Sequence, residues 1–470
     1  MSDSTPHLSR RRFLAAAGAT TAASATLAAT PALAQGATPA AAQPVFPQQL
    51  PILITTSVQP ILPKGKAKRV VICGGGWGGL SAAKHLRKAD PSLEVILLEK
   101  NPSFFSGPMS NKWLVDIVDT QFLQHDYLQV ADKYGYRFIQ AEVTGFERDR
   151  KRVYTAQGYL EYDFLVLAAG IRYNFEAWFG DDVAAANYTR THFPSAYIPN
   201  NEMFRLKKGI QEFKGGDLLM TLPPPPHRCP PSPYERATLL AWMFTVKKVK
   251  GHITILDPKD SPRPLGPGFK EAWEELYPGM VTYVPNARVQ SVDPYNKRIV
   301  TEAGDFKWDH AILMTPHQAG DMVWKAGGIG KNAEGKPTGW ANVDQFMLNL
   351  KDDPDTYVVG DSVGFVSPHF GFYPKSAHVA HRLGRIVAGY IAQRAAGKTP
   401  KYALPDNLCY MMVNGGLNGG PQEDLLVTFD YKVNEQGIIQ QTQVDDNVRS
   451  HRLVKEDFGW ATGMYADLFS

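Results

Sequence analysis

A glycine-rich turn between two apolar segments constrains the fold of this chain more than any other feature. Residues 68–73 (KRVVIC) are apolar and lead directly into residues 74–79 (GGGWGG). A stretch with helical spacing follows at 80–88, and a second apolar segment occupies 94–98. Strand, glycine turn, helix and strand within about 30 residues predict a βαβ unit, and hence an α/β fold with a parallel sheet.

The same turn has the chemistry of a dinucleotide site. Gly74, Gly76 and Gly79 fit the spacing G-x-G-x-x-G, and Glu99 ends the second strand 20 residues after Gly79. Glycines permit the tight turn and the approach of a pyrophosphate, which the N-terminus of the following helix stabilises. The Glu99 carboxylate accepts ribose hydroxyls and disfavours a ribose with a 2′-phosphate. We predict that these four residues and Lys100 bind the ADP half of a dinucleotide.

Two later segments indicate which dinucleotide is bound. Residues 165–170 (LVLAAG) form an apolar strand that ends at Gly170, and residues 357–361 (YVVGD) form another that ends at Gly360 and Asp361. They resemble segments of FAD-dependent proteins related to the disulfide reductases, in which the aspartate holds the ribityl chain of the flavin. Each segment alone also fits a core strand that ends in a turn. The glycine turn and these two segments, in this order, indicate FAD rather than NAD.

A second βαβ-like pass runs from 217–222 to 253–257, and its turn lacks glycines. Residues 222–231 (LPPPPHRCPP) stand where a nicotinamide-binding unit would have glycines. Proline offers no N–H to a phosphate, and its ring blocks the close approach of a ligand to the backbone. We therefore expect two Rossmann-like domains of which the second binds no NAD(P)H.

Composition and charge exclude several classes of protein. The chain has 470 residues, 44% of them hydrophobic and 20% charged, which is typical of a soluble protein with two or three folding units. A net charge of +4 without a Lys/Arg block predicts no nucleic-acid partner. Three cysteines and scattered histidines give no metal-ligand spacing. The sequence has no run of 18 or more apolar residues after the N-terminal segment, so it predicts no membrane span there.

The N-terminus has the pattern of an export signal. Residues 9–14 (SRRRFL) contain a twin arginine, an Ala-rich stretch follows, and residues 32–34 (ALA) fit a cleavage site. A basic helix lying on a membrane fits less well, because the stretch has no large apolar face. We predict export to the periplasm by the twin-arginine route, which carries folded proteins that often hold a cofactor. The expected divisions are a signal peptide (1–34), a linker (35–66), an FAD-binding domain (67–200 and 331–400), a second Rossmann-like domain (201–330) and a smaller C-terminal α+β domain (401–470).

Four segments carry a resemblance to a known family over nearly all of the mature chain. They are residues 110–111 (SN), 224–237 (PPPHRCPPSPYERA), 316–320 (PHQAG) and 374–376 (PKS). They resemble the flavoprotein subunit of flavocytochrome c sulfide dehydrogenase, within the wider sulfide:quinone oxidoreductase group. The resemblance implies oxidation of sulfide at a cysteine pair beside FAD and transfer of electrons to a c-type cytochrome subunit.

The cysteines depart from the pattern that the resemblance implies. Cys229 is the candidate nucleophile, because Arg228 and a following helix N-terminus favour its thiolate; its alternative is a core cysteine in a proline-braced turn. The resemblance implies a second redox cysteine just after the Gly-Asp motif, where the chain has Val363. Cys73 and Cys409 are both expected in core strands.

Two further positions complete the predicted site. Gly107 stands where the resemblance implies a cysteine that attaches the flavin, so FAD is expected to bind non-covalently. Lys375 precedes a predicted helix beside the flavin and is a candidate to stabilise a reduced, anionic ring; an exposed surface lysine is the alternative.

The sequence thus predicts an exported FAD-dependent oxidoreductase that oxidises sulfide or a related reduced sulfur compound and passes electrons to a c-type cytochrome. The alternatives are a non-sulfide substrate, accommodated by the aromatic-rich residues 363–373, reduction of quinone, or an electron-transfer or binding subunit without turnover.

Overall fold

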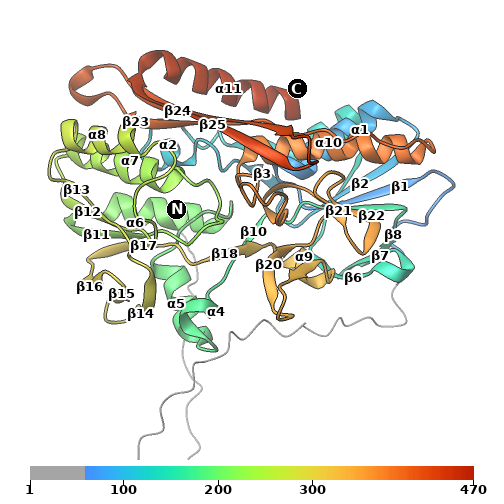
Figure 1. Cartoon of the computed structure of the whole chain (residues 1–470), viewed down its shortest axis with the longest axis horizontal. Coiled ribbons are helices and arrows are strands. Elements are labelled where there is room, and N and C mark those ends of the chain that lie inside the picture. Colours follow the sequence, from blue (N-terminus) through green and yellow to red (C-terminus); the bar gives the residue numbers. More distant parts are fainter. Residues whose placement is uncertain (1–58) are drawn as a thin grey trace, which may run out of the picture. The chain divides into compact units, whose positions relative to one another are not determined.

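A six-stranded sheet forms the first Rossmann-like part of the computed structural model, which describes residues 59–470 (Figure 1). Five strands are parallel and the edge strand β21 is antiparallel, so the predicted α/β fold is confirmed. Its strands, in spatial order, are β21 (Asn349–Leu350), β22 (Asp353–Val358), β9 (Phe164–Leu167), β1 (Arg69–Cys73), β2 (Glu94–Glu99) and β5 (Arg137–Gln140).

Two long helices lie side by side against this sheet (Figure 1). They are α1 (Trp77–Ala89), which follows the glycine turn, and α10 (Ala377–Ala395), which confirms the helix predicted there. The contact needs a glycine, because a Cβ on Gly384 would lie 2.3 Å from the carbonyl oxygen of Gly78. The hydroxyl of Ser81 also donates to the carbonyl of His381 at 2.8 Å. Helix α1 is thereby held in place behind the turn.

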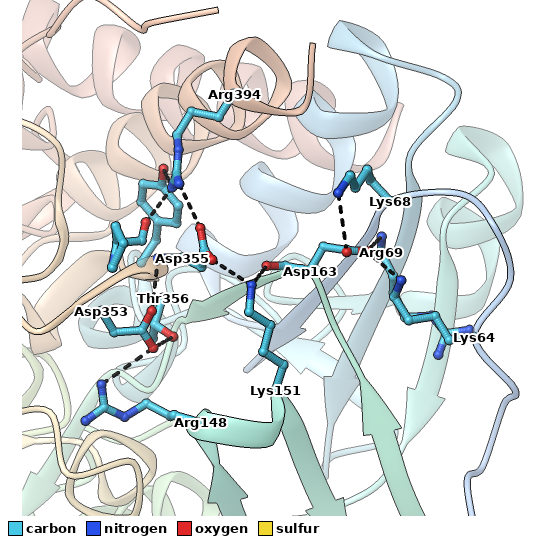
Figure 2. Close-up of polar contacts among 12 residues, drawn as sticks. Lys64, Lys68, Arg69, Arg148, Lys151, Asp163, Asp353, Asp355, Thr356 and Arg394 are labelled. Carbon is cyan, nitrogen blue, oxygen red and sulfur yellow. Dashed lines mark hydrogen bonds and ion pairs between the residues drawn. The ribbon is translucent and has the colours of Figure 1, made fainter. Parts of the chain in front are cut away.

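The amino ends of the sheet strands are closed by paired charges (Figure 2). Asp163, just before β9, accepts a hydrogen bond from the backbone N–H of Arg69 at 2.7 Å. Asp355 in β22 accepts from Lys151 at 2.6 Å and from Arg394 at 2.7 Å. Each carboxylate therefore has cationic or N–H partners from distant parts of the sequence, which fixes the strand order at this end.

The last residues of the predicted linker contact this same edge. Pro60 forms a bridge with Tyr159, and the guanidinium of Arg69 donates to the carbonyl of Pro63 at 2.8 Å. Lys64 lies 3.0 Å from Asp163. The predicted signal peptide and the rest of the linker lie outside the described residues.

The second Rossmann-like part has a four-stranded parallel sheet. In spatial order its strands are β13 (Val281–Val284), β12 (Lys250–Leu256), β11 (Gly215–Thr221) and β17 (His310–Leu313). The helices of this part are α6 (Asn201–Glu212), α7 (Ser232–Val246) and α8 (Gly266–Glu275). Helix α7 is buried along most of its length, and it begins directly after the proline-rich turn.

Smaller elements connect these parts. They are β3 (Ser103–Phe105), α2 (Ser110–Leu114), β4 (Gln124–Asp126), α3 (Tyr127–Tyr134), β6 (Val143–Glu147), β7 (Arg152–Thr155), β8 (Gly158–Glu161), β10 (Ile171–Tyr173), α4 (Glu176–Phe179), α5 (Val183–His192), β14 (Val289–Asp293), β15 (Arg298–Thr301), β16 (Gly304–Lys307), β18 (His317–Ala319), α9 (Asp321–Lys325), β19 (Ile329–Lys331) and β20 (Pro337–Ala341).

The C-terminal part is a three-stranded antiparallel sheet followed by a helix (Figure 1). The elements are β23 (Asn407–Asn414), β24 (Glu423–Val433), β25 (Ile439–Ser450) and α11 (His451–Phe469). The three strands and the helix agree with the smaller C-terminal α+β domain that the sequence predicts. The hydroxyl of Ser450 caps the helix by accepting from the N–H of Arg452 at 3.1 Å.

The helices were also compared with what a bilayer requires. None of those within residues 59–470 combines the length and the apolar character that a transmembrane helix needs.

Candidate active site

The carboxyl ends of β1, β2 and β9 open into a cavity that the glycine turn lines. Gly74 has φ 109°, and a Cβ there would lie 2.3 Å from the carbonyl oxygen of Ala168. A Cβ on Gly79 would lie 1.8 Å from the carbonyl oxygen of Gly74. Gly76 has open space around its Cα and lies on the wall of the cavity. The first and third glycines are therefore needed for backbone packing, whereas Gly76 leaves room for a ligand.

Glu99 and Lys100 line the same cavity, here named the glycine cavity, whose volume is about 570 Å³. One carboxylate oxygen of Glu99 accepts from the N–H of Gly75 at 2.7 Å, and the other accepts from the N–H of Asn101 at 2.8 Å. These bonds fix the carboxylate at the edge of the glycine turn. The predicted cofactor-binding residues at this end therefore fit the adenosine half of FAD.

A second cavity of about 170 Å³ adjoins the first, and Gly76, Gly170 and Arg228 line both. We name it the thiol cavity. Its wall includes two cysteines, two tryptophans and several charged groups. Lining residues are Trp77, Gly107, Lys112, Arg228, Cys229, Glu235, Gly360, Asp361, Lys375, Cys409, Asp457 and Trp460. The two cavities therefore meet at the residues that they share.

Asp361 lies where the sequence predicted the ribityl half of the flavin. Its carboxylate is 6% exposed and accepts from the guanidinium of Arg228 at 2.5 Å. Arg228 also donates to the carbonyl of Tyr197 at 2.6 Å. Gly360 has φ 74°, a conformation that a glycine adopts without strain. Arg228 therefore joins the Gly-Asp motif to the residue before Cys229.

Cys229 lies in a constrained turn at the base of α7. Its φ is 47°, in the left-handed region that non-glycine residues rarely adopt, and such positions concentrate at functional sites. Its N–H donates to the carbonyl of Lys375 at 2.9 Å. The side chain is partly buried, and α7 begins three residues later at Ser232. The turn therefore holds the thiol between the Lys375 segment and the N-terminus of α7.

The structure places Cys409 beside Cys229, and the two free thiols are hydrogen-bonded. That bond, followed by burial, holds the pKa of Cys409 well above its usual value. Cys409 therefore keeps its proton more firmly than an ordinary cysteine does. Cys409 lies in a strand, as expected, and it also contacts Cys229, a contact that the sequence did not show.

Contacts from both Rossmann-like parts position the strand that carries Cys409. The N–H of Met412 donates to Glu235 on α7 at 3.0 Å. At the start of β23, the hydroxyl of Ser376 donates to the side-chain oxygen of Asn407 at 2.7 Å. Because one contact comes from α7 and the other from the cap of α10, β23 is fixed across the mouth of the Cys229 turn. Cys73, by contrast, is fully buried in β1 as predicted, and burial raises the pKa of its thiol.

Lys375 is a buried cation and not an exposed surface lysine. It is 3% exposed, and its ammonium donates to the carbonyl of Val363 at 2.5 Å. The ammonium also lies 4.4 Å from the centre of the Trp340 ring. Burial lowers its pKa to about 7, although Asp361 opposes the shift. The side chain is therefore able to change its charge near neutral pH inside the thiol cavity.

The second Rossmann-like part has a buried acid at the end of β12. Asp257 is fully buried, and one carboxylate oxygen accepts from the hydroxyl of Tyr234 at 2.5 Å and from that of Tyr283 at 3.0 Å. The other lies 2.9 Å from the ammonium of Lys259. An acid at the end of the second strand of a dinucleotide-binding unit normally accepts ribose hydroxyls. In this chain, both carboxylate oxygens of Asp257 already have partners within the protein.

The sequence analysis missed the charged groups behind the thiol cavity. Lys112, Glu235 and Asp457 are all buried, and they come from α2, α7 and α11. Charged residues are rarely buried unless they are paired, so their pattern in the sequence alone resembles that of solvated surface positions. Trp460 donates to buried His378 at 3.0 Å, and both residues line the cavity.

Comparison with known proteins gives two family matches. Residues 204–314 match the family described as sulfide dehydrogenase (flavocytochrome c) flavoprotein chain, central. Residues 68–198 match the pyridine nucleotide-disulphide oxidoreductases. The type II NADH:quinone oxidoreductase of Staphylococcus aureus is 31% identical over 105 residues, which are 22% of this chain and 26% of that relative. The match thus spans about a quarter of the length of that relative.

Solved structures share the fold at low identity. The sulfide:quinone oxidoreductase of Aquifex aeolicus superimposes with a TM-score of 0.66 and 17% identity, over 86% of this chain and 92% of that one. An NAD-dependent persulfide reductase from A. fulgidus gives a TM-score of 0.56 at 17% identity, over 85% and 77% of the two chains.

Proposed function

Taking this chain as an FAD-dependent oxidoreductase similar to flavocytochrome c sulfide dehydrogenase and sulfide:quinone oxidoreductase, we propose that it oxidises sulfide, or a related reduced sulfur compound, at Cys229 and Cys409. The observation that carries the proposal is the hydrogen-bonded thiol pair in a cavity that adjoins the glycine cavity. No metal is needed for this chemistry, because the sulfur atoms themselves form and break the bonds.

The chemistry is an exchange between sulfide and the disulfide form of the pair. HS⁻ attacks one sulfur of the disulfide, which forms a persulfide on that cysteine and releases the other cysteine as a thiolate. FAD, when bound, supplies an acceptor for the electron pair of the reduced sulfur.

The residues around the pair bind and orient the cofactor. Gly74, Gly76, Gly79 and Glu99 would hold its ADP half, and Asp361 would hold its ribityl chain. Lys375 would place a positive charge in the thiol cavity and stabilise a reduced, anionic ring.

Non-covalent attachment of the cofactor and the absence of a nicotinamide site belong to the same proposal. Gly107 lines the thiol cavity with no atom within 4 Å of its Cβ position, and it offers no side chain for a bond to the flavin. In the second Rossmann-like part, prolines replace the glycine turn, and the hydroxyls of Tyr234 and Tyr283 donate to the carboxylate of Asp257. We therefore propose that NAD(P)H is not the reductant, unlike in the type II NADH:quinone oxidoreductase relative.

The electron acceptor and the compartment are proposed from the sequence. Resemblance to the flavocytochrome c flavoprotein chain supports a c-type cytochrome as acceptor. The twin-arginine pattern at residues 9–14 supports export to the periplasm.

The test is the visible spectrum of the purified holoprotein before and after anaerobic addition of sulfide. The proposal predicts bleaching of the flavin by sulfide, no bleaching by NADH, and reoxidation by a c-type cytochrome. Acid precipitation is expected to release the flavin from the protein. A bound flavin that ignores sulfide would reject the proposal and favour a non-sulfide substrate, whereas reoxidation by a quinone alone would reject the cytochrome.

A further inference from the structure

The glycine cavity and the thiol cavity meet at one place, and a single charged side chain stands there. The residues that line both cavities are Gly76, Ala168, Gly170, Pro199 and Arg228. We name this set the junction. The first four members have no side-chain hydrogen-bond donor. Arg228 is therefore the member of the junction that brings a positive charge and side-chain N–H groups to it.

The guanidinium of Arg228 is held in place by two hydrogen bonds and keeps a further donor. Its Nε donates to the carboxylate of Asp361 at 2.5 Å, and its Nη1 donates to the carbonyl of Tyr197 at 2.6 Å. Among residues 59–470, the structure gives no acceptor for Nη2. Because a guanidinium is planar and rigid, two fixed nitrogens also fix the direction of the third.

Nη2 lies directly over Gly170. A Cβ at Gly170 would lie 2.9 Å from Nη2, so a side chain at this position would push the guanidinium out of the junction. The hydroxyl of Ser362 donates to the carbonyl of Gly170 at 2.6 Å. Since Ser362 follows Asp361 in the chain, two adjacent residues fix both the acidic partner of the guanidinium and the backbone beneath it.

The backbone of Arg228 ties this guanidinium to the turn that carries the thiol. The N–H of Arg228 donates to Nδ1 of buried His317 at 3.1 Å. The next N–H, that of Cys229, donates to the carbonyl of Lys375 at 2.9 Å. The same short segment therefore reaches the junction with its side chain and the thiol cavity with the following residue.

The order of groups within FAD brings an anion to the junction. The ribose of the ADP half is assigned to Glu99 in the glycine cavity, and the ribityl chain is assigned to Asp361 in the thiol cavity. The diphosphate joins these two sugars, so a molecule that spans both cavities carries its diphosphate through the junction. Gly76, at the start of helix α1, also lies there, and a helix N-terminus stabilises phosphate.

We propose that Arg228 binds the diphosphate of FAD through its free Nη2 group. The inference rests on the proposed function, in which FAD spans the two cavities. Arginine suits this role because its N–H groups match the geometry of phosphate oxygens and its charge strengthens the hydrogen bond. Arg228 is thus a cofactor-binding residue, and it holds the cofactor and the start of the Cys229 turn in one frame.

The first test is the phosphorus NMR spectrum of the full-length holoprotein, in which the two phosphates of bound FAD give separate resonances. Arg228→Lys keeps the positive charge, so we expect this variant to retain FAD. At least one phosphorus resonance should move by more than its linewidth, because an ammonium replaces the guanidinium. Arg298→Met on β15 is the control, since Arg298 pairs only with Asp305 on the surface and both resonances should stay at their wild-type positions.

The second test is the rate at which the holoprotein releases FAD after dilution, followed by the fluorescence of the free flavin. Arg228→Met removes both the charge and the donor, so release should become about tenfold faster or more, as expected for the loss of a charge-assisted hydrogen bond. Arg228→Lys should restore most of the wild-type rate. If Arg228→Met holds no FAD after purification, the spectrum of Arg228→Lys decides alone.

Unchanged phosphorus resonances in Arg228→Lys would overturn the inference even if FAD leaves faster, because the arginine would then act only through Asp361. Neither experiment uses sulfide. A protein with the shifted resonance whose flavin ignores sulfide would therefore reject only the proposed substrate. Normal bleaching by sulfide together with unchanged resonances would reject only the contact between Arg228 and the diphosphate.

Discussion

The two ends of one parallel sheet hold their charges in opposite ways. At the amino ends, Asp163 and Asp355 each have close N–H or cationic partners (Figure 2). At the carboxyl ends, Lys375 is buried with a backbone carbonyl as its hydrogen-bond acceptor, and the pKa of Cys409 is raised by its contact with Cys229 and by burial. Charged groups with close partners of opposite charge stabilise a fold, whereas groups with strongly shifted pKa values are concentrated at functional sites. The amino edge is therefore the part that stabilises, and the carboxyl edge is the part that reacts.

The largest effect is expected at the glycine turn. Gly79→Ala places a Cβ 1.8 Å from a backbone oxygen, so the turn must open and the helix N-terminus moves away from the phosphate site. We expect purified G79A to contain little or no flavin, measured as the flavin-to-protein absorbance ratio. Gly389→Ala in α10 is the matched control, because its Cβ meets no atom within 4 Å. If G79A keeps a full complement of flavin, the glycine cavity is not the cofactor site.

Lys375 is expected to give a smaller, pH-dependent effect. Its pKa is about 7 when folded and near 10.5 when unfolded, so between these values the unfolded chain binds more protons. Stability should therefore rise with pH from about 7 to about 10.5, and Lys375→Met should remove this rise in urea unfolding curves. The variant should also lose the inflection near pH 7 in the rate of flavin reduction. An unchanged pH profile would show that the ammonium does not act on the flavin.

The smallest effect on activity is expected at the amino edge. Asp355→Asn weakens the bonds with Lys151 and Arg394 and should lower the free energy of unfolding by about 1–3 kcal/mol. Flavin content and the rate of reduction should stay at wild-type values. A variant that folds normally but reduces its flavin more slowly would break the distinction between the two edges.

The fold was predictable where its signals are local in sequence. The glycine turn, the strand before it and Glu99 all fall within one βαβ unit, and their spacing alone specifies the geometry. The sequence predicted the α+β class of the C-terminal part but not the position of helix α11, because Gly459 and Gly463 lower the helix propensity of α11. Its stability comes from packing onto the C-terminal sheet, which a local pattern does not report.

The site was predictable only in part, because its second thiol is brought in by distant contacts. Cys229 stands out by its proline-rich neighbours, but Cys409 lies 180 residues later in an ordinary strand. Its position depends on how Glu235 and Asn407 fix β23 between two parts of the chain. The one signal in the sequence was the scarcity of cysteines, since only two remain once Cys73 is placed in β1. Buried charges such as Lys112 carry no local signal at all.

The most direct test of the account is anaerobic addition of sulfide to the holoprotein of Cys409→Ser, with Cys73→Ser as the matched control. The account predicts that C73S bleaches its flavin at the wild-type rate, whereas C409S and C229S keep an oxidised flavin and wild-type flavin content. Wild-type bleaching in C409S would contradict the central claim, because the chemistry would then need no second thiol beside Cys229.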